Sequence, residues 1–333
     1  MTPIKPRIVY MGTPEFAVAP LSKLIENNFN VVGVVTVPDK PSGRGLKLNE
    51  SDVKKYTLLN NLTQKGVCLM QPVSLKDEQF IKQLQLLNAD IFIVVAFRML
   101  PKVIWSMPKL GTFNLHGSLL PQYRGAAPIN WAIINGEKES GVTTFLIDEQ
   151  IDTGNILMQR DCTISDRETI ETLYDKLMVI GANLVIETVN GLVEGTLHPH
   201  PQQGEIKGAP KLTKETGRIQ WNMQNNTPYS TAILIDRLTR GLSPYPAATA
   251  TISNGEKSFD FKIFEVEIAK EEKKYDGKQD YGKIVSDNKT YLHAVCGDGS
   301  ILAINNIQMA GKKRMSIKEF LMGFRNIESY KFI

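Results

Sequence analysis

Apolar runs of strand length alternate with amphipathic segments through the first half of the chain. Residues 7–12, 30–37 and 89–97 are almost continuously apolar, which is typical of strands buried on both faces of a parallel sheet. Between such runs the apolar residues recur at helical spacing, as over residues 51–66, where Ser51 stands at the N-cap position. This alternation predicts a doubly wound, mostly parallel α/β domain.

The same periodicities predict the other elements of this region. The first strand ends in a turn that contains Gly12 and leads into a helix from Pro14, without the G-x-G-x-x-G pattern of dinucleotide-binding folds. A nicotinamide-dependent oxidoreductase is therefore disfavoured. Further strands are expected over residues 67–70, 111–116 and 141–147 and from residue 154, and further helices over residues 77–87, 128–136 and 168–194.

The pattern changes after residue 197. Residues 198–211 are polar and contain several Pro and Gly, which is typical of a linker. Beyond them a predicted helix ends at Arg240, and five short strands follow, separated by turns such as Asn254-Gly255. Five short strands in about a hundred residues suit a small β-barrel of the oligonucleotide-binding type. We therefore expect a Rossmann-like catalytic domain over 1–197, a linker over 198–211 and a C-terminal β-barrel domain over 212–333, with barrel strands over 247–252, 259–266, 282–286, 291–295 and 300–307.

Composition changes this picture little. The 333 residues are 42% hydrophobic and 22% charged, as in an ordinary soluble protein. No apolar run is long enough to suggest a membrane span, and we expect no membrane association. The three cysteines, Cys68, Cys162 and Cys296, are far apart, and the four histidines lack metal-ligand spacing. These features suit a cytoplasmic protein without a metal.

Charge is unevenly distributed along the chain. The net charge is +4, and the residues from Leu212 onward carry 18 Lys and Arg against 14 Asp and Glu, so the C-terminal third holds the whole excess. Its sharpest basic cluster is Lys312, Lys313 and Arg314. A local basic excess suits a polyanionic partner, although surface lysines that maintain solubility explain it about as well.

A second basic segment lies in the first domain. Residues 38–50 form a long stretch rich in Gly and Pro, with Lys40, Arg44 and Lys47 as its basic residues. Because it follows a strand of a parallel sheet, we expect it to lie over the carboxyl edge, where ligands bind in such folds. A loop of this length is either functional or simply mobile, and the sequence alone favours neither.

The chemistry of the chain is concentrated in the stretch that begins at Asn114. Side chains alternate along a strand, so Asn114 and His116 share a face, where an amide and an imidazole can stabilise a carbonyl oxygen that gains negative charge. Downstream, Asp152 follows another strand and can orient the imidazole, with Asp148 and Glu149 as the alternative carboxylates. The alternative is that these are ordinary polar residues at a loop edge.

The surrounding residues resemble the folate-dependent formyltransferases. The run Phe113 to Pro128, FNLHGSLLPQYRGAAP, is similar to the signature of that family, and Gly141-Val142-Thr143 with Ile151 to Gly154 is similar to its second motif. Residues 9–17 and 37–45 narrow the resemblance to the members that act on charged initiator tRNA. Residues 211–219 and 309–313 are similar to conspicuous C-terminal segments of those members.

This resemblance implies transfer of the formyl group of 10-formyltetrahydrofolate to the amino group of methionine on initiator tRNA. It implies a barrel domain that holds the body of the tRNA, and we expect a monomer. Carried over by position, the catalytic residues are Asn114, His116 and Asp152, the folate contacts are Ser118, Leu119, Leu120 and Pro121, and Arg44 falls in the loop that reaches the tRNA acceptor end. We also expect the basic residues Lys47, Lys312, Lys313 and Arg314 to contact the tRNA.

One stretch departs from the family pattern. Phe97-Arg98-Met99-Leu100-Pro101 replaces the commoner aromatic-Gly-x-Ile-Leu-Pro sequence, and Arg98 is therefore expected to change the rim of the pterin pocket.

Two alternatives remain beside the tRNA-directed activity. One is a formyltransferase for a small amine, such as a glycinamide ribonucleotide or an amino-sugar nucleotide, but the basic loop and the extra C-terminal domain are not needed for a small acceptor. The other is a non-catalytic RNA-binding protein on an inactive enzyme fold, which the presence of Asn114, His116 and Asp152 disfavours.

Overall fold

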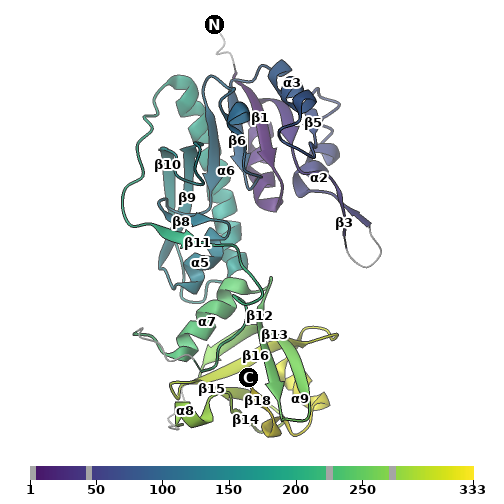
Figure 1. Cartoon of the computed structure of the whole chain (residues 1–333), viewed down its shortest axis with the longest axis vertical. Helices are drawn as coiled ribbons and strands as arrows, with labels where there is room; N and C mark the ends of the chain where they lie inside the picture. The colour runs from purple at the N-terminus through teal and green to yellow at the C-terminus, as the bar shows by residue number, and fades with distance from the viewer. Residues whose placement is uncertain (1–4, 43–46, 223–227, 270–274) are drawn as a thin grey trace. The chain divides into compact units, whose positions relative to one another are not determined.

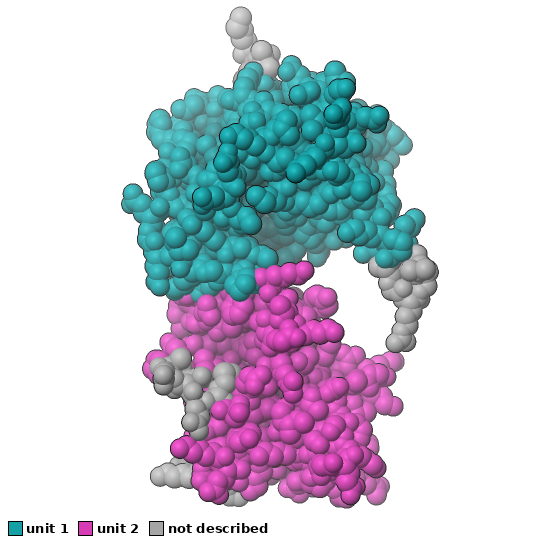
Figure 2. Space-filling view, in the orientation of Figure 1, with its two compact units in different colours: residues 1–128, 139–163, 174–210 teal, residues 129–138, 164–173, 211–333 magenta. Residues whose placement is uncertain are grey.

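The computed structural model describes residues 5–42, 47–222, 228–269 and 275–333. The chain divides into two compact units, which are coloured separately in Figure 2. Two short segments of the first half of the chain, 129–138 and 164–173, belong to the second unit. Unit 1 comprises Met1–Pro128, Glu139–Thr163 and Tyr174–Pro210, and unit 2 comprises Ile129–Lys138, Ile164–Leu173 and Lys211–Ile333.

Unit 1 is built on a seven-stranded sheet. Its strands are β1 (Arg7–Gly12), β2 (Asn30–Val35), β5 (Cys68–Met70), β6 (Ile91–Val95), β7 (Thr112–His116), β9 (Glu139–Leu146) and β10 (Ile156–Thr163). They lie in the order β10-β9-β7-β6-β1-β2-β5 (Figure 1). The pairs from β7 to β5 are parallel, whereas β9 runs antiparallel to both β7 and β10. The predicted mostly parallel, doubly wound fold is confirmed.

Burial explains why these runs form the centre of the sheet. All five residues of β6 are buried, as expected from its continuous apolar sequence. The side chain of Ser51 accepts a hydrogen bond from the Lys54 amide, and Asp77 caps the next helix through the Phe80 amide. The helices of this unit are α1 (Val18–Glu26), α2 (Asp52–Leu59), α3 (Glu78–Leu86), α4 (Lys102–Trp105) and most of α6 (Ile170–Glu194).

Two local features differ from the sequence expectation. The first helix begins as a short 3-10 turn, Glu15–Ala17, before α1. The segment predicted as a long loop contains strands β3 (Lys40–Ser42) and β4 (Lys47–Asn49), which pair with each other in a separate two-stranded sheet. At its base, Asp39 accepts a hydrogen bond of 2.8 Å from Gln71 and forms an ion pair with Lys54.

The stretch predicted as a linker makes regular backbone contacts within unit 1. Strand β11 (Lys207–Ala209) pairs in parallel with β8 (Gln122–Gly125). The Ala209 carbonyl also accepts hydrogen bonds from the amides of Ala126 and Ala127, at 2.8 and 3.2 Å. A polar, Pro-rich composition therefore did not prevent these residues from adding a strand beside the signature segment.

Helix α6 is the longest in the described part of the chain. It meets the length and composition expected of a membrane-spanning helix, contrary to the expectation that no segment would. Its Leu177, Leu184 and Val189 are nevertheless fully buried in unit 1, and Gly181 lies against Leu115 of β7. These contacts are those of a core helix.

Unit 2 contains an antiparallel sheet whose strands curve around an apolar core. The order is β14-β15-β16-β13-β12-β18, with β17 paired to β16. All five predicted barrel strands are present, and β17 and β18 extend the sheet. The strands are β12 (Ala248–Ser253), β13 (Ser258–Ile268), β14 (Ile284–Ser286), β15 (Leu292–Val295), β16 (Ile301–Met309), β17 (Met315–Ser316) and β18 (Lys331–Phe332), and the longer helices are α5 (Pro128–Ile134), α7 (Thr231–Leu242) and α9 (Ile317–Gly323).

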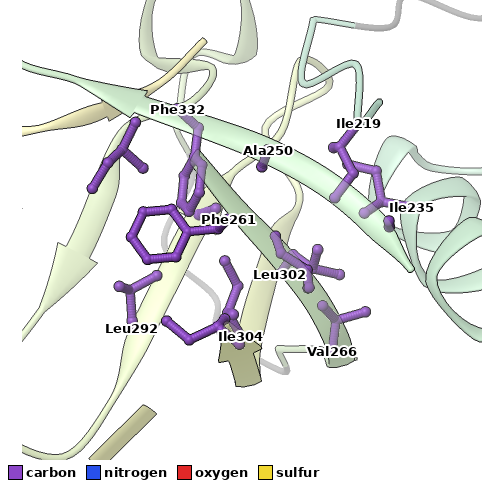
Figure 3. Packing of buried hydrophobic residues seen from close by; sticks show 14 of the residues in the cluster. Ile219, Ile235, Ala250, Phe261, Val266, Leu292, Leu302, Ile304 and Phe332 are labelled. Atoms are coloured by element: carbon purple, nitrogen blue, oxygen red, sulfur yellow. The ribbon is translucent and has the colours of Figure 1, made fainter. Parts of the chain in front are cut away.

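Apolar side chains from these strands fill the interior of unit 2. Figure 3 shows Phe261, Leu302 and Phe332 within this cluster. The Trp221 ring stacks on Phe332 with a centroid separation of 4.4 Å. The side chain of Ser316 caps α9 in a reciprocal arrangement with Glu319, which fixes the start of that helix.

Candidate active site

Strand β7 presents Asn114 and His116 on one face of the unit 1 sheet. It is paired on both sides, with Asn114 opposite Val94 of β6 and Phe145 of β9. His116 is buried, whereas Asn114 is partly exposed. Within the described part of the chain, no group hydrogen-bonds the carboxamide of Asn114. Its Nδ2 is therefore available to donate to a ligand oxygen.

The ring of His116 is fixed by a backbone contact. Its Nε2 lies 2.9 Å from the carbonyl oxygen of Tyr123 in β8. Because a carbonyl oxygen only accepts hydrogen bonds, this contact assigns the proton of the neutral ring to Nε2 and leaves the lone pair on Nδ1. Phe145 packs edge-on against the ring, with centroids 6.4 Å apart. The imidazole thus presents a proton acceptor at Nδ1.

Asp152 faces that nitrogen. Its Oδ2 lies 3.9 Å from Nδ1 of His116 and accepts a hydrogen bond of 2.9 Å from the Gly125 amide. The separation is too long for a hydrogen bond, but it suits stabilisation of the ring once Nδ1 takes a proton. From the sequence, Asp152 was expected to orient the ring. In the structure the hydrogen bond that orients the ring is donated by its Nε2 to the Tyr123 carbonyl, and the role of Asp152 remains a prediction.

The loop that carries Asp152 follows an unexpected path. The sequence suggested that both site segments follow strand ends at one edge of the sheet. Because β9 runs antiparallel to β7, its end at Leu146 lies beside Phe113, at the start of β7. A Cβ on Gly154 would stand 1.7 Å from the Leu146 carbonyl oxygen, so this position requires glycine. The loop therefore carries Asp152 toward His116 first and then returns at Gly154 to lie tightly against the end of β9.

The two alternative carboxylates are engaged elsewhere. Asp148 accepts hydrogen bonds from the Thr153 hydroxyl at 2.7 and 2.9 Å and from the Gln150 amide at 3.0 Å. Glu149 pairs with Lys102 at 2.6 Å, and this contact lowers the pKa of the Glu149 carboxyl. Of the three carboxylates considered from the sequence, Asp152 is the one that faces the imidazole.

The segment expected to contact folate is largely enclosed by protein. Ser118, Leu120 and Pro121 are buried, and Leu119 is partly exposed. The Ser118 hydroxyl donates to the Gln122 carbonyl at 2.6 Å, so it closes its own turn. The structure thus gives this segment a fixed shape beside His116, while its contacts with folate remain a prediction.

Two side chains of the antiparallel strands, Thr143 of β9 and Gln159 of β10, bind the backbone of residues 118–120. The Thr143 hydroxyl donates to the Ser118 carbonyl at 2.6 Å and accepts from the Leu120 amide at 3.1 Å. Gln159 donates to Thr143 and to the Leu120 carbonyl, at 2.9 and 3.0 Å. These buried and partly buried bonds satisfy polar groups of the turn and fix its backbone.

Arg98 joins two loops that follow strands of the parallel sheet. Its Nη1 and Nη2 donate to the carbonyls of Val73 and Pro72, at 3.0 and 2.7 Å, and burial lowers the pKa of the guanidinium. The guanidinium also lies over the Phe97 ring, 5.3 Å from its centroid. Its role at a pterin pocket remains a prediction.

The expected tRNA-binding residues fall into two groups. Arg44 lies outside the described residues, and Lys47 begins β4. Lys312, Lys313 and Arg314 are exposed on the turn that leads from β16 to β17 in unit 2. The guanidinium of Arg314 lies 4.3 Å from the centroid of the Phe264 ring, and its Nε donates to Asn306 at 2.7 Å. This turn therefore presents a cationic surface.

Sequence reasoning missed Tyr123 and Gln202 as parts of the site. Tyr123 acts through its backbone carbonyl, which leaves no mark in the side-chain pattern. Gln202 bonds to the Asp152 turn and to Arg124 from a stretch read as a linker. Across residues 5–42, 47–222, 228–269 and 275–333, no group of three or more His, Cys, Asp or Glu side chains is placed to hold a metal ion.

Several full-length relatives match this chain. Methionyl-tRNA formyltransferase of Bacteroides thetaiotaomicron is 48% identical over 332 residues, which cover 98% of each chain. The protein of the same name from Parabacteroides distasonis is 49% identical over 97% of each chain.

Solved structures with low sequence identity share the fold. WlaRD, a sugar 3N-formyl transferase, superposes with a TM-score of 0.61 at 21% identity, over 94% of this chain and 100% of that one. HypX from Aquifex aeolicus superposes with a TM-score of 0.62 at 18% identity, and this chain spans 49% of its length.

The family models match both halves of the chain. The model described as formyl transferase matches residues 6–189, and the model of the formyl transferase C-terminal domain matches residues 211–325. The first match contains the strand of Asn114 and His116, the Asp152 turn and the sheet that supports them. The chain therefore belongs to the formyltransferase family.

Proposed function

We propose that this chain transfers the formyl group of 10-formyltetrahydrofolate to the amino group of methionine on initiator tRNA. The observation that carries the proposal is the full-length similarity, near 48% identity, to relatives named methionyl-tRNA formyltransferase. The geometry supports it, because Asn114 and His116 are alternate residues of β7 and Asp152 lies 3.9 Å from His116, an arrangement suited to acyl transfer.

The residues of the site have distinct tasks in this reaction. The amine forms a bond to the formyl carbon, the bond from that carbon to N10 of the folate breaks, and the proton that the amine loses ends on N10. Asn114 Nδ2 donates to the formyl oxygen as that oxygen gains negative charge. His116 accepts the amine proton at Nδ1 and delivers it to the leaving nitrogen. Asp152 stabilises the ring while it is charged.

Neutral and charged forms of the ring both suit this cycle. In the neutral form Nε2 donates to the Tyr123 carbonyl, so Nδ1 is free to take a proton. In the charged form Nδ1–H faces the carboxylate of Asp152. The ring therefore need not rotate between the two proton transfers.

The basic surfaces are assigned to the tRNA. Lys312, Lys313 and Arg314 contact phosphates through unit 2, and Arg44 and Lys47 contact the acceptor end. Folate contacts fall on residues 118–121. The enzyme works in the cytoplasm as a monomer and without a metal.

A formylation assay tests the proposal. Charged initiator tRNA, charged elongator tRNA and small amines are each offered with 10-formyltetrahydrofolate, and the formylated product is measured. Selective formylation of initiator Met-tRNA is expected. Transfer only to a small amine would keep the chemistry of unit 1 and remove the tRNA assignment. Binding of tRNA without any transfer would contradict the catalytic role.

A further inference from the structure

Gln202 connects two parts of the active site. Its Nε2 donates to the carbonyl oxygens of Asp152 and Gly154, both at 2.9 Å. Its Oε1 accepts from Nε and Nη2 of Arg124, at 3.0 and 2.7 Å. One carboxamide thus joins the turn that carries Asp152 to β8, the strand whose backbone holds both His116 and Asp152.

The backbone on both sides of Gln202 is anchored. His200 and Ile156 exchange two backbone hydrogen bonds, at 2.8 and 3.0 Å, which ties the segment to the start of β10. On the other side β11 pairs with β8. The side chain of Gln202 therefore projects from a segment held at both ends, and it can serve as a fixed point for the turn.

The direction of the Asp152 side chain depends on the backbone of its turn. Asp152 has a φ of +56°, in the left-handed region. Its carboxylate receives one hydrogen bond, from Gly125, and stands 3.9 Å from His116. Because the backbone of the turn sets the direction of this carboxylate, a small rotation there would move Oδ2 away from the imidazole.

We propose that Gln202 is a positioning residue for formyl transfer, which holds the Asp152 turn so that the carboxylate faces Nδ1 of His116. This inference rests on the proposed function, since it assigns Gln202 a role in the same reaction. Gln202 touches neither the imidazole nor the carboxylate, and it acts through the carbonyls of Asp152 and Gly154.

The contacts require a carboxamide of this length. A glutamate at this position would still accept from Arg124 but could not donate to the two carbonyls. An asparagine is one methylene shorter and could not reach both the turn and Arg124. Q202E is therefore close to isosteric with the native residue, removes the donated bonds and adds a negative charge beside the turn, whereas Q202A removes all of the bonds without adding a charge.

The experiment compares Q202E and Q202A with the wild-type enzyme and with Q203A. Gln203 is the exposed neighbour in sequence, so Q203A is the matched control. For each protein, kcat and the KM values for 10-formyltetrahydrofolate and Met-tRNA are measured, together with Tm. The imidazole ¹⁵N resonances of His116 are recorded by NMR and assigned with H116A.

We expect Q202E and Q202A to lower kcat by about 10- to 100-fold, because small displacements of catalytic groups have effects of this size. Both KM values should stay within about twofold of wild type, and the Nδ1 resonance of His116 should shift as the carboxylate moves. Q203A should match wild type in every measurement. Unchanged kcat in Q202E, or a rise in KM alone, would overturn the proposal.

Two other outcomes are separated by the same experiment. If Q202A does not fold, Q202E and the His116 resonance still decide the question, because Q202E retains the bonds to Arg124. If the wild-type enzyme transfers no formyl group, the proposed function fails, and the NMR comparison then tests the positioning role alone. An unshifted Nδ1 resonance in Q202E would show that Gln202 does not set the geometry of the site.

Discussion

Two aspartates, Asp236 in unit 2 and Asp152 in unit 1, differ in how completely their carboxylates are bound. Asp236 of α7 is buried, and its two oxygens accept from Arg167 at 2.8 Å and Arg240 at 2.9 Å. Those arginines also donate to backbone carbonyls of Val266 and Glu168, both at 2.9 Å. The carboxylate thus lies in a closed network within unit 2.

The carboxylate of Asp152 is bound far less completely. It accepts one backbone hydrogen bond, and its ionisable neighbour His116 is 3.9 Å away. The Asn114 carboxamide beside this pair has no partner within the described residues. A polar cluster that only maintains the fold has its bonds satisfied, whereas a catalytic cluster keeps groups available for its substrates. Substitutions in the two clusters should therefore affect different properties.

The largest effect is expected in the closed network. D236A leaves the largely buried Arg240 without its charged partner, which should lower the stability of unit 2 by about 3–5 kcal/mol. The corresponding calorimetric transition should fall by about 10 °C or more. D166N is the control, because Asp166 forms an exposed ion pair with Lys138, and its transition should barely move. Equal losses in both variants would remove the distinction between a closed network and a surface pair.

The next effect concerns the open cluster. N114A removes the proposed donor to the formyl oxygen, so kcat should fall by roughly 10²–10³-fold. Its Tm should stay close to that of wild type, since the Asn114 carboxamide bonds to no described group. Steady-state formylation of Met-tRNA and calorimetry measure the two quantities. A loss of stability with normal kcat would place Asn114 among the structural residues.

The smallest effect is expected at the basic turn of unit 2. The double variant K312A/K313A should raise the KM for Met-tRNA and leave kcat and the KM for folate unchanged. It should also reduce the slope of log K against log salt by roughly 1.4–1.8, if each lysine contacts one phosphate. K65A/K82A removes two exposed lysines of unit 1 and serves as the control. Equal salt slopes in the two double variants would contradict the assignment of Lys312 and Lys313 to tRNA.

Much of the fold follows from local pattern. Continuous apolar runs identified β1, β2 and β6, and Ser51 and Asp77 cap helices α2 and α3. Alternation along β7 placed Asn114 and His116 on one face. These features depend on residues that are close in the sequence, so their physical causes can be recognised without a structure.

The rest depends on contacts between distant parts of the chain. The antiparallel direction of β9 is set by its neighbours and not by its own residues, so the path of the Asp152 loop could not be anticipated. Gln202 bonds to residues about 50 and 78 positions away, and its polar, Pro-rich surroundings resemble those of a linker. The inclusion of residues 129–138 and 164–173 in unit 2 likewise follows from packing such as the Arg167–Asp236 pair.

The central claim is that His116 takes the amine proton while the charge of Asp152 stabilises the ring. The most direct test is the single-turnover rate of formyl transfer in D152N, with both substrates bound at saturating concentration. Because asparagine keeps the size of the side chain but removes its charge, the rate should fall by about 100-fold or more while both substrates bind as in wild type. A single-turnover rate near that of wild type would contradict the account.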